Sequence, residues 1–200
     1  MTAEEIFSCL EEKFGAKRET LDKWSVTAVL SATYLRNAVE FLRDGDAAKF
    51  EMLVDIAGID YLTYPNHEGP RFAVAYAFKS ISNPGLRIRL KVLVGEDNLK
   101  VPTISDLYAN ANWYEREVYD QFGIVFEGHP DLRRLLNHVE FVGHPLRKDY
   151  PAQKRQWLST NDYLLPELEK RLQDLGYRVI QRSKEVETND NEFLEGSIKE

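Results

Sequence analysis

The segment from Trp113 to Pro151 constrains the fold more than any other part of this chain. It mixes charged, aromatic, glycine and proline residues, and after Gly123 it follows neither a helical nor a strand period. A run of that length without regular structure is uncommon inside a compact domain. Its many apolar side chains argue against simple disorder. The pattern therefore predicts an extended Pro/Gly-rich ribbon over residues 123–156, called the ribbon below, that lies on another protein.

Composition limits the class of protein that carries this ribbon. The chain has 200 residues, of which 43% are hydrophobic and 12% aromatic, and this predicts a globular protein with a core of its own. Its one cysteine, Cys9, cannot form an internal disulfide or supply the ligands of an iron–sulfur cluster, and it favours a reducing compartment. We expect Cys9 to be a small buried apolar residue.

Charge and hydropathy exclude several further classes. A net charge of −7 disfavours nucleic acid as a partner, because such proteins need a basic face. The start is acidic and polar, so it does not resemble a secretory signal. No stretch is long and apolar enough to be expected to span a bilayer.

The residues before the ribbon predict one α+β domain over residues 1–122, a two-layer structure with a mixed β-sheet packed by helices. Thr2 and Glu5 form a capping-box pattern at the start of the first helix, and Gly15 ends it. The other expected elements are a strand over 24–30, a helix starting after Ser31 or Thr33 and ending before Gly45, strands over 52–59, 72–81 and 86–94, and a helical region from 103 or 105 to 122 with a break near 110–112.

Beyond the ribbon we expect a small C-terminal unit over residues 157–182. Pro166 is typical of a helix start and Gly176 of a helix end, so a short helix is predicted over 167–175. Residues 177–180 could form one more strand. Residues 183–200 are acidic and almost without apolar side chains, which predicts a disordered tail.

Two adjacent carboxylates, Glu115 and Glu117, are the first candidates for chemistry, as a general acid and base. Positions two apart on a helix diverge by about 200° of arc, however, so these carboxylates should not share a face. Arg116 and Asp120 are four apart and do share one. We therefore favour a helix crossed by ion pairs over an acid–base pair.

Three histidines of the ribbon, His129, His138 and His144, lie close in sequence to Asp131 and Asp149, so a metal site has to be considered. Their spacings match no common ligand pattern. Proline follows His129 and His144 directly, which favours extended backbone there. We expect histidines that form hydrogen bonds or contact a partner rather than a metal.

The pairs Arg133-Arg134 and Arg147-Lys148 could clamp a phosphate or a carboxylate. Acidic and basic residues are equal in number between residues 115 and 155, however. That balance fits reciprocal pairing, inside the chain or across an interface, better than an anion site. The aromatic residues Trp113, Tyr114, Tyr119 and Phe122 are expected to be core or interface anchors. No phosphate-binding glycine loop is present.

The ribbon and the helix before it resemble the 30 kDa-type (C-type) subunit of proton-pumping NADH:quinone oxidoreductase, respiratory complex I. The first block reads E-R-E-V-Y-D-Q-F over 115–122, with His129, Arg133 and Leu135 in the family's register; only Gln121 departs from it, where an apolar residue is usual. The second block is G-H-P-L-R-K-D-Y-P over 143–151. The segments L-V-D-I-A-G-I-D-Y (53–61) and R-I-R-L-K-V (87–92) agree in kind. The resemblance covers about residues 20–152 and leaves 153–200 unmatched.

This resemblance implies a subunit without a redox centre, which supports electron transfer from NADH to quinone coupled to proton translocation and has no catalytic, cofactor or metal residues of its own. FMN, the iron–sulfur clusters and quinone would belong to neighbouring subunits. The implied partners are the hydrogenase-like (D-type) subunit and the iron–sulfur subunits of the B and I types, on the cytoplasmic face of the bacterial membrane. The motif residues implied to lie at interfaces are Glu115, Arg116, Glu117, Asp120, His129, Arg133, Arg134, His144, Arg147, Lys148 and Asp149.

Three alternatives stay open at this point. The same type of subunit occurs in complexes fed by ferredoxin or F420 and in membrane hydrogenases. A hydrolase or metalloenzyme using Glu115, Glu117 and His129 is a second possibility, and a generic binding module is a third.

Overall fold

The computed structural model describes residues 2–19, 26–45, 49–154, 156 and 159–177, and these form two compact units. The first unit contains residues up to 139 together with 143–150, and the second contains residues 140–142 and the chain from 151 onward. No helix within these ranges is long and apolar enough to cross a membrane. The predicted strand over 177–180 and the predicted tail over 183–200 lie outside the described residues, apart from Tyr177.

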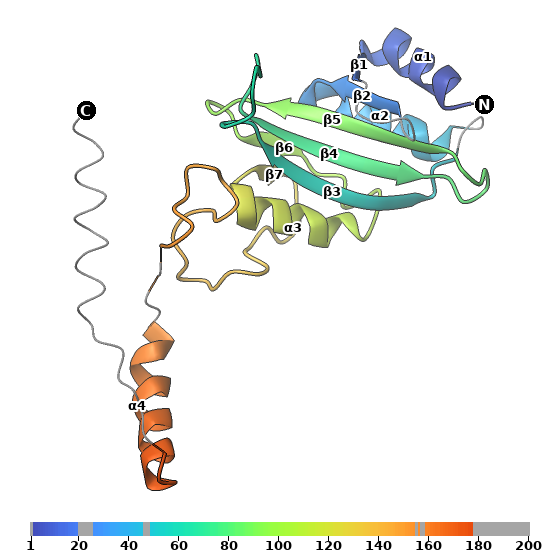
Figure 1. Cartoon of the computed structure of the whole chain (residues 1–200). Helices are drawn as coiled ribbons and strands as arrows, with labels where there is room; N and C mark the ends of the chain where they lie inside the picture. The colour runs from blue at the N-terminus through green and yellow to red at the C-terminus, as the bar shows by residue number, and fades with distance from the viewer. Residues whose placement is uncertain (1, 20–25, 46–48, 155, 157–158, 178–200) are drawn as a thin grey trace. The chain divides into compact units, whose positions relative to one another are not determined.

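A mixed five-stranded sheet forms the first unit, in the order β1-β2-β5-β4-β3 (Figure 1). The parallel pair is β2 with β5, and the remaining neighbours are antiparallel. The strands are β1 (Lys17–Glu19), β2 (Val26–Leu30), β3 (Met52–Asp60), β4 (Phe72–Lys79) and β5 (Arg87–Val94). This is the α+β fold class predicted above.

Three helices bury one face of this sheet. The helix α1 (Ala3–Phe14) contacts β2, α2 (Ala32–Asp44) contacts β5, and α3 (Ala111–Phe122) contacts β3 (Figure 1). Alternate side chains of β4 and β5 point into a common core with these helices, and Tyr76 and Leu90 lie at its centre with no exposed surface. Such burial of large apolar groups supplies most of the driving force for folding.

The capping signals predicted at α1 are confirmed, whereas at α2 Ser31 precedes the helix without forming a capping hydrogen bond. Thr2 Oγ1 accepts the N–H of Glu5, and Glu5 returns a bond to the N–H of Thr2, so the capping box is complete. Gly15 follows in the left-handed conformation, with φ +64°. Lys91, on the more polar face of β5, is buried because Glu19 of β1 accepts from its ammonium group at 2.7 Å.

The globular unit continues past the boundary predicted at residue 122. A second, two-stranded parallel sheet joins β6 (Lys100–Pro102) to β7 (Val125–Glu127), and Ile124 and Phe126 are buried in the core. Strands of three residues leave too short a pattern to be recognised in sequence. The irregular part of the ribbon therefore begins after Glu127, not after Gly123.

The C-terminal helix α4 (Ser159–Asp174) is longer than predicted and contains Pro166 in its interior. Proline lacks an N–H and costs one helical hydrogen bond, so its position suggested a helix start. The helix instead begins at Ser159, where the carboxylate of Glu140 accepts hydrogen bonds from the N–H and the hydroxyl of Ser159. That contact joins residues 19 apart, which local sequence does not reveal.

Candidate functional site

The motif residues lie on α3 and on the part of the ribbon that packs beside it. Val118 and Phe122 of α3 face the core, and the ring of Phe122 lies directly against Gly58 of β3. A Cβ on Gly58 would overlap that ring, so glycine is needed for this close approach of helix and strand. This contact fixes the distance between α3 and β3, and the charged residues of α3 face the ribbon.

Asp120 is the anchor of the ribbon. Its side chain is fully buried and accepts the backbone N–H groups of Leu135, Leu136 and Asn137 at 2.8–3.0 Å. It also accepts from the guanidinium of Arg134 at 2.8 Å. Burial alone would raise the pKa of this carboxyl, but the hydrogen bonds outweigh it and lower the pKa to about 2. An ionised carboxylate therefore closes the loop over 134–137.

Two arginines hold the ribbon through its backbone carbonyls. Arg116 is largely buried and donates to the carbonyl oxygens of Arg133 and Arg134 at 3.2 and 3.3 Å, with Trp113 stacked on its guanidinium. Arg134 donates to the carbonyl of Gly143 at 3.0 Å, so it also joins the two halves of the motif. Since these carbonyls are satisfied inside the chain, the irregular backbone needs no sheet or helix.

The second motif block is tied to the C-terminal end of α3. His144 Nδ1 lies 3.0 Å from the carbonyl oxygen of Asp120, and Arg147 Nε donates to the carbonyl of Phe122 at 2.7 Å. These are carbonyls that a helix leaves without partners at its end. Burial lowers the pKa of His144, and the nearby arginines act in the same direction.

A second buried carboxylate, Asp60, binds the end of the same block. It is buried at the end of β3 and accepts from Arg71 at 3.0 Å and from the N–H of Lys148 at 2.8 Å. Arg71 also pairs with Asp149 at 2.9 Å. Burial would raise the pKa of Asp60, but these donors lower it to about 2. Asp60 lies within the 53–61 segment quoted above, where no role was expected of it; its position at the end of an apolar strand is the signal that could have found it.

Glu115 has a different environment from the other carboxylates. It is fully buried and accepts from the N–H of Ile104 at 2.8 Å and from the hydroxyl of Thr103. Burial raises its pKa to about 7, and these two hydrogen bonds offset only part of that rise. Glu117 is exposed on another face of α3, so the two glutamates form no acid–base pair.

Stability should therefore fall as the pH rises through the titration of Glu115. Below about pH 4.5 the carboxyl is protonated in both the folded and the unfolded protein. Between about pH 4.5 and pH 7 it ionises in the unfolded protein only. This lowers the free energy of unfolding by roughly 3 kcal/mol by pH 8. Glu115→Gln removes this group. We expect urea denaturation to show the variant gaining that amount over the parent between pH 5 and pH 8. Parallel profiles for the two proteins would contradict the assignment.

His129 uses both ring nitrogens within the chain. Its Nδ1 accepts the N–H of Asp131 at 3.0 Å, so Nε2 carries the proton and donates to the carbonyl of Asn112 at 3.1 Å. Within the described part of the chain no three His, Cys, Asp or Glu side chains form a group that could hold a metal ion. His129 and His144 therefore act as structural hydrogen-bonding groups.

The remaining motif residues are exposed. Arg133 pairs only with its neighbour Asp131 among the described residues, and the side chains of Glu117 and Lys148 face solvent. The structure therefore divides the motif into two sets. The side chains of the first set bond within the chain: Glu115, Arg116, Asp120, His129, Arg134, His144, Arg147 and Asp149. The side chains of the second set face outward: Glu117, Arg133 and Lys148.

Comparison with known proteins agrees with this layout. The family described as "Respiratory-chain NADH dehydrogenase, 30 Kd subunit" matches residues 28–156, which include most of the sheet, α3 and the whole ribbon. The chain belongs to this family. The C-type subunits of NADH-quinone oxidoreductase from Burkholderia vietnamiensis and Burkholderia multivorans are each 44% identical over 148 residues, covering 72% of this chain and 74% of the relative.

Solved structures show the same fold. A trypsin-resistant fragment of Nqo5 superposes with a TM-score of 0.58 at 40% identity, covering 66% of this chain and all of the fragment. A chain of the membrane-bound sulfane sulfur reductase, an archaeal respiratory membrane complex, superposes with a TM-score of 0.59 and covers 90% of this chain and 95% of its own. At 22% identity this second likeness concerns the fold alone.

Proposed function

We propose that this chain is a non-redox scaffold subunit in the hydrophilic arm of a NADH:quinone oxidoreductase, where it supports electron transfer from NADH to quinone coupled to proton translocation. The observation that carries the proposal is the match over residues 28–156, because it includes both the α+β domain and the ribbon. In this proposal the chain contributes no catalytic residue, and FMN, iron–sulfur clusters and quinone lie in neighbouring subunits of the translocase.

The ribbon supports a docking role through the way its groups are distributed. The buried Asp120 of α3 binds backbone N–H groups of the ribbon, and the ribbon's Arg134 and Arg147 bind carbonyls within the chain, so the backbone is ordered before any partner arrives. Several of its large apolar side chains are exposed instead: Leu136 is 64% exposed, Val139 84% and Leu146 52%. A surface ordered by internal polar bonds and covered with apolar groups loses little entropy when a partner covers it.

Partners and location follow from the same proposal. The hydrogenase-like subunit and the iron–sulfur subunits of the B and I types would cover the ribbon, and the chain would be a peripheral protein on the cytoplasmic face of the bacterial membrane, attached through the complex. In the second unit, α4 exposes Leu164, Leu165 and Leu168, which offers a further apolar surface for these subunits.

The electron donor is the finer question. The sulfane sulfur reductase chain shares the fold, so the fold alone does not distinguish an NADH-fed complex from one fed by ferredoxin or F420. The relatives at 44% identity are named NADH-quinone oxidoreductase subunits, and they favour NADH. Purification of the tagged chain from its native membranes tests both the scaffold function and the electron donor. Recovery with NADH-oxidising flavoprotein subunits supports the proposal, and recovery as a lone soluble protein contradicts it.

The exposed apolar residues of the ribbon give a sharper test. Leu136→Ser combined with Val139→Ser should lower the amount of assembled complex at least tenfold, because each lost apolar contact costs about 1.5–3 kcal/mol. Quinone reductase turnover per assembled complex should stay unchanged. The measurement is quantitative recovery of the complex on native gels, with NADH:quinone activity normalised to it.

The matched control changes exposed apolar residues outside the ribbon. Leu62→Ser with Ile81→Ser alters side chains that are 51% and 63% exposed, and it should leave assembly unchanged. Equal assembly of the two double variants, or full assembly of the ribbon variant with lost turnover, would argue against a scaffold surface at the ribbon.

A further inference from the structure

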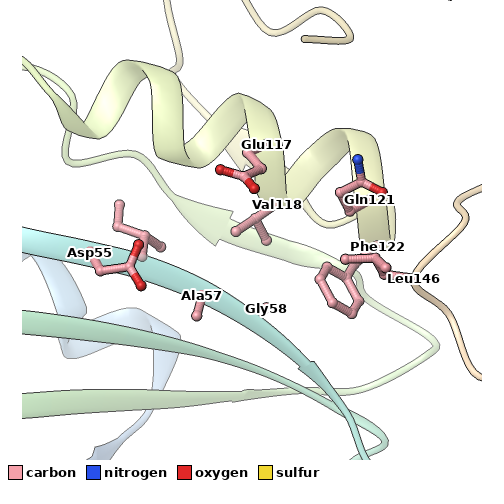
Figure 2. A pocket seen from close by; sticks show the side chains of 9 residues that line it. Asp55, Ala57, Gly58, Glu117, Val118, Gln121, Phe122 and Leu146 are labelled. Carbon is pink, nitrogen blue, oxygen red and sulfur yellow. The ribbon is translucent and has the colours of Figure 1, made fainter. Parts of the chain in front are cut away.

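A groove lies beside the free edge of the main sheet. β3 is the last strand in the sheet order, so the backbone groups on its outer edge have no partner strand among the described residues. Between this strand and α3 there is a hollow of about 190 Å³, lined by residues 55–58 of β3, by Glu117, Val118, Gln121 and Phe122 of α3, and by Leu146 (Figure 2). That volume can hold about one long side chain but not a helix.

The edge strand carries only part of the usual protection against pairing with another chain. Exposed sheet edges are normally blunted by charged side chains, lysine above all, by proline, by a β-bulge or by short length. β3 is nine residues long, contains neither lysine nor proline, and exposes Met52 and Val54 by more than 40% each. Its register shift between Leu53 and Asp55 leaves residues 55–60 in regular pairing with β4. The segment 55–59 is therefore a template for an added strand.

Two carboxylates flank the groove. Asp55 projects from β3 and Glu117 from α3, and Figure 2 shows both on the two sides of the gap. Both residues are exposed, and neither carboxylate forms an ion pair among the described residues. This differs from the buried carboxylates of the same region, Asp60 and Asp120, which bind arginines. The apolar part of the lining comes from Val118, Phe122 and Leu146.

We propose that this groove, formed by the outer edge of β3 and the facing side of α3, binds an extended segment of another subunit that carries a lysine or arginine. The segment adds as an antiparallel or parallel strand along residues 55–59, and its cation lies between Asp55 and Glu117. Backbone pairing supplies the affinity of such strand addition, and the side chain in the pocket supplies its specificity. The proposal rests on the scaffold function above and names a second contact, separate from Leu136 and Val139 of the ribbon.

Charge reversal tests this in the assembled complex. Asp55→Lys with Glu117→Lys places two cations where the partner's cation binds, and we expect at least a tenfold loss of assembled complex. The matched control, Glu12→Lys with Asp97→Lys, changes net charge equally at exposed sites away from the groove and should keep assembly within twofold. Equal assembly of both double variants overturns the proposal.

A second measurement does not depend on disrupting the contact. Ala57→Cys, in a chain whose single natural thiol is removed by Cys9→Ser, places a thiol on the exposed edge strand. Maleimide should label it at least tenfold more slowly in the purified complex than in the isolated chain. A photoreactive cross-linker on that thiol should capture a segment with a lysine or arginine from another subunit. If the thiol is labelled as fast in an intact complex as in the isolated chain, the proposal that this groove binds a partner is wrong, but the scaffold function still holds. If the chain joins no complex at all, the scaffold function itself is wrong.

Discussion

Asp120→Asn is expected to free the ribbon from α3 and to destabilise the protein by about 3–5 kcal/mol. The substitution removes the charge that faces Arg134 and replaces an acceptor oxygen by an amide donor opposite backbone N–H groups. Breaking a buried, hydrogen-bonded ion pair from one side has this magnitude, because Arg134 loses the charge that faces it and the backbone N–H groups of residues 135–137 lose an ionised acceptor. Urea denaturation measures the free energy, and hydrogen exchange should show lost protection of the amides of residues 135–137.

The control for this prediction is Asp131→Asn. Asp131 pairs with Arg133 at the surface, where both side chains are more than half exposed, so its loss should cost less than about 1 kcal/mol.

Acid should destabilise the protein in the same way as Asp120→Asn, because it protonates Asp120. The folded pKa of Asp120 lies near 2, below its usual value of 3.8, so its contribution is present above about pH 4 and is lost as the pH falls through 2. Unchanged exchange at residues 135–137 would show that another group holds the loop.

Gly123→Ala is the second substitution expected to have a large effect. Gly123 ends α3 with φ +76°, and a Cβ there would lie 2.5 Å from Arg147 Nη2 and 2.6 Å from His144 Nε2. Relief of that overlap requires the side chains of Arg147 and His144 to move, which weakens their bonds to the carbonyls of Phe122 and Asp120. We expect a cost of about 3 kcal/mol, of which only about 1 kcal/mol is the left-handed backbone.

Gly128→Ala separates these two contributions. Its φ of +84° imposes the same backbone penalty, but its nearest neighbour, Thr103 Cγ2, lies at an ordinary 3.4 Å. The difference in unfolding free energy between the two variants therefore measures the crowding alone. In the assembled complex, Gly123→Ala should lower recovery while Gly128→Ala leaves it nearly unchanged. Equal costs for both glycines would mean that the second motif block is not held by the end of α3.

The elements that depend on neighbouring residues were predictable from sequence. The capping box at Thr2 and the glycines after α1 and α3 are short-range patterns, and the structure contains each of them. The divergence of Glu115 and Glu117 on α3 also follows from helical geometry alone. The α+β class follows from the order of these elements.

The roles of the charged motif residues were decided by tertiary contacts. A sequence cannot distinguish a carboxylate that pairs with its own chain from one that faces a partner, because Asp120 and Arg134 are separated by 14 residues and Asp60 and Lys148 by 88. The same limit hid the strands β6 and β7, whose pairing joins residues 25 apart.

Sequence alone thus determined where regular structure begins and ends and which segment departs from it, since capping, turn and periodicity signals act between residues close in the chain. Tertiary structure decided that Arg134 and Arg147 of the ribbon bond within the chain, while Leu136 and Val139 stay exposed and β3 lies at the edge of the sheet. The physical reason is that burial sets the cost of an unpaired charge, and burial is a property of the whole fold.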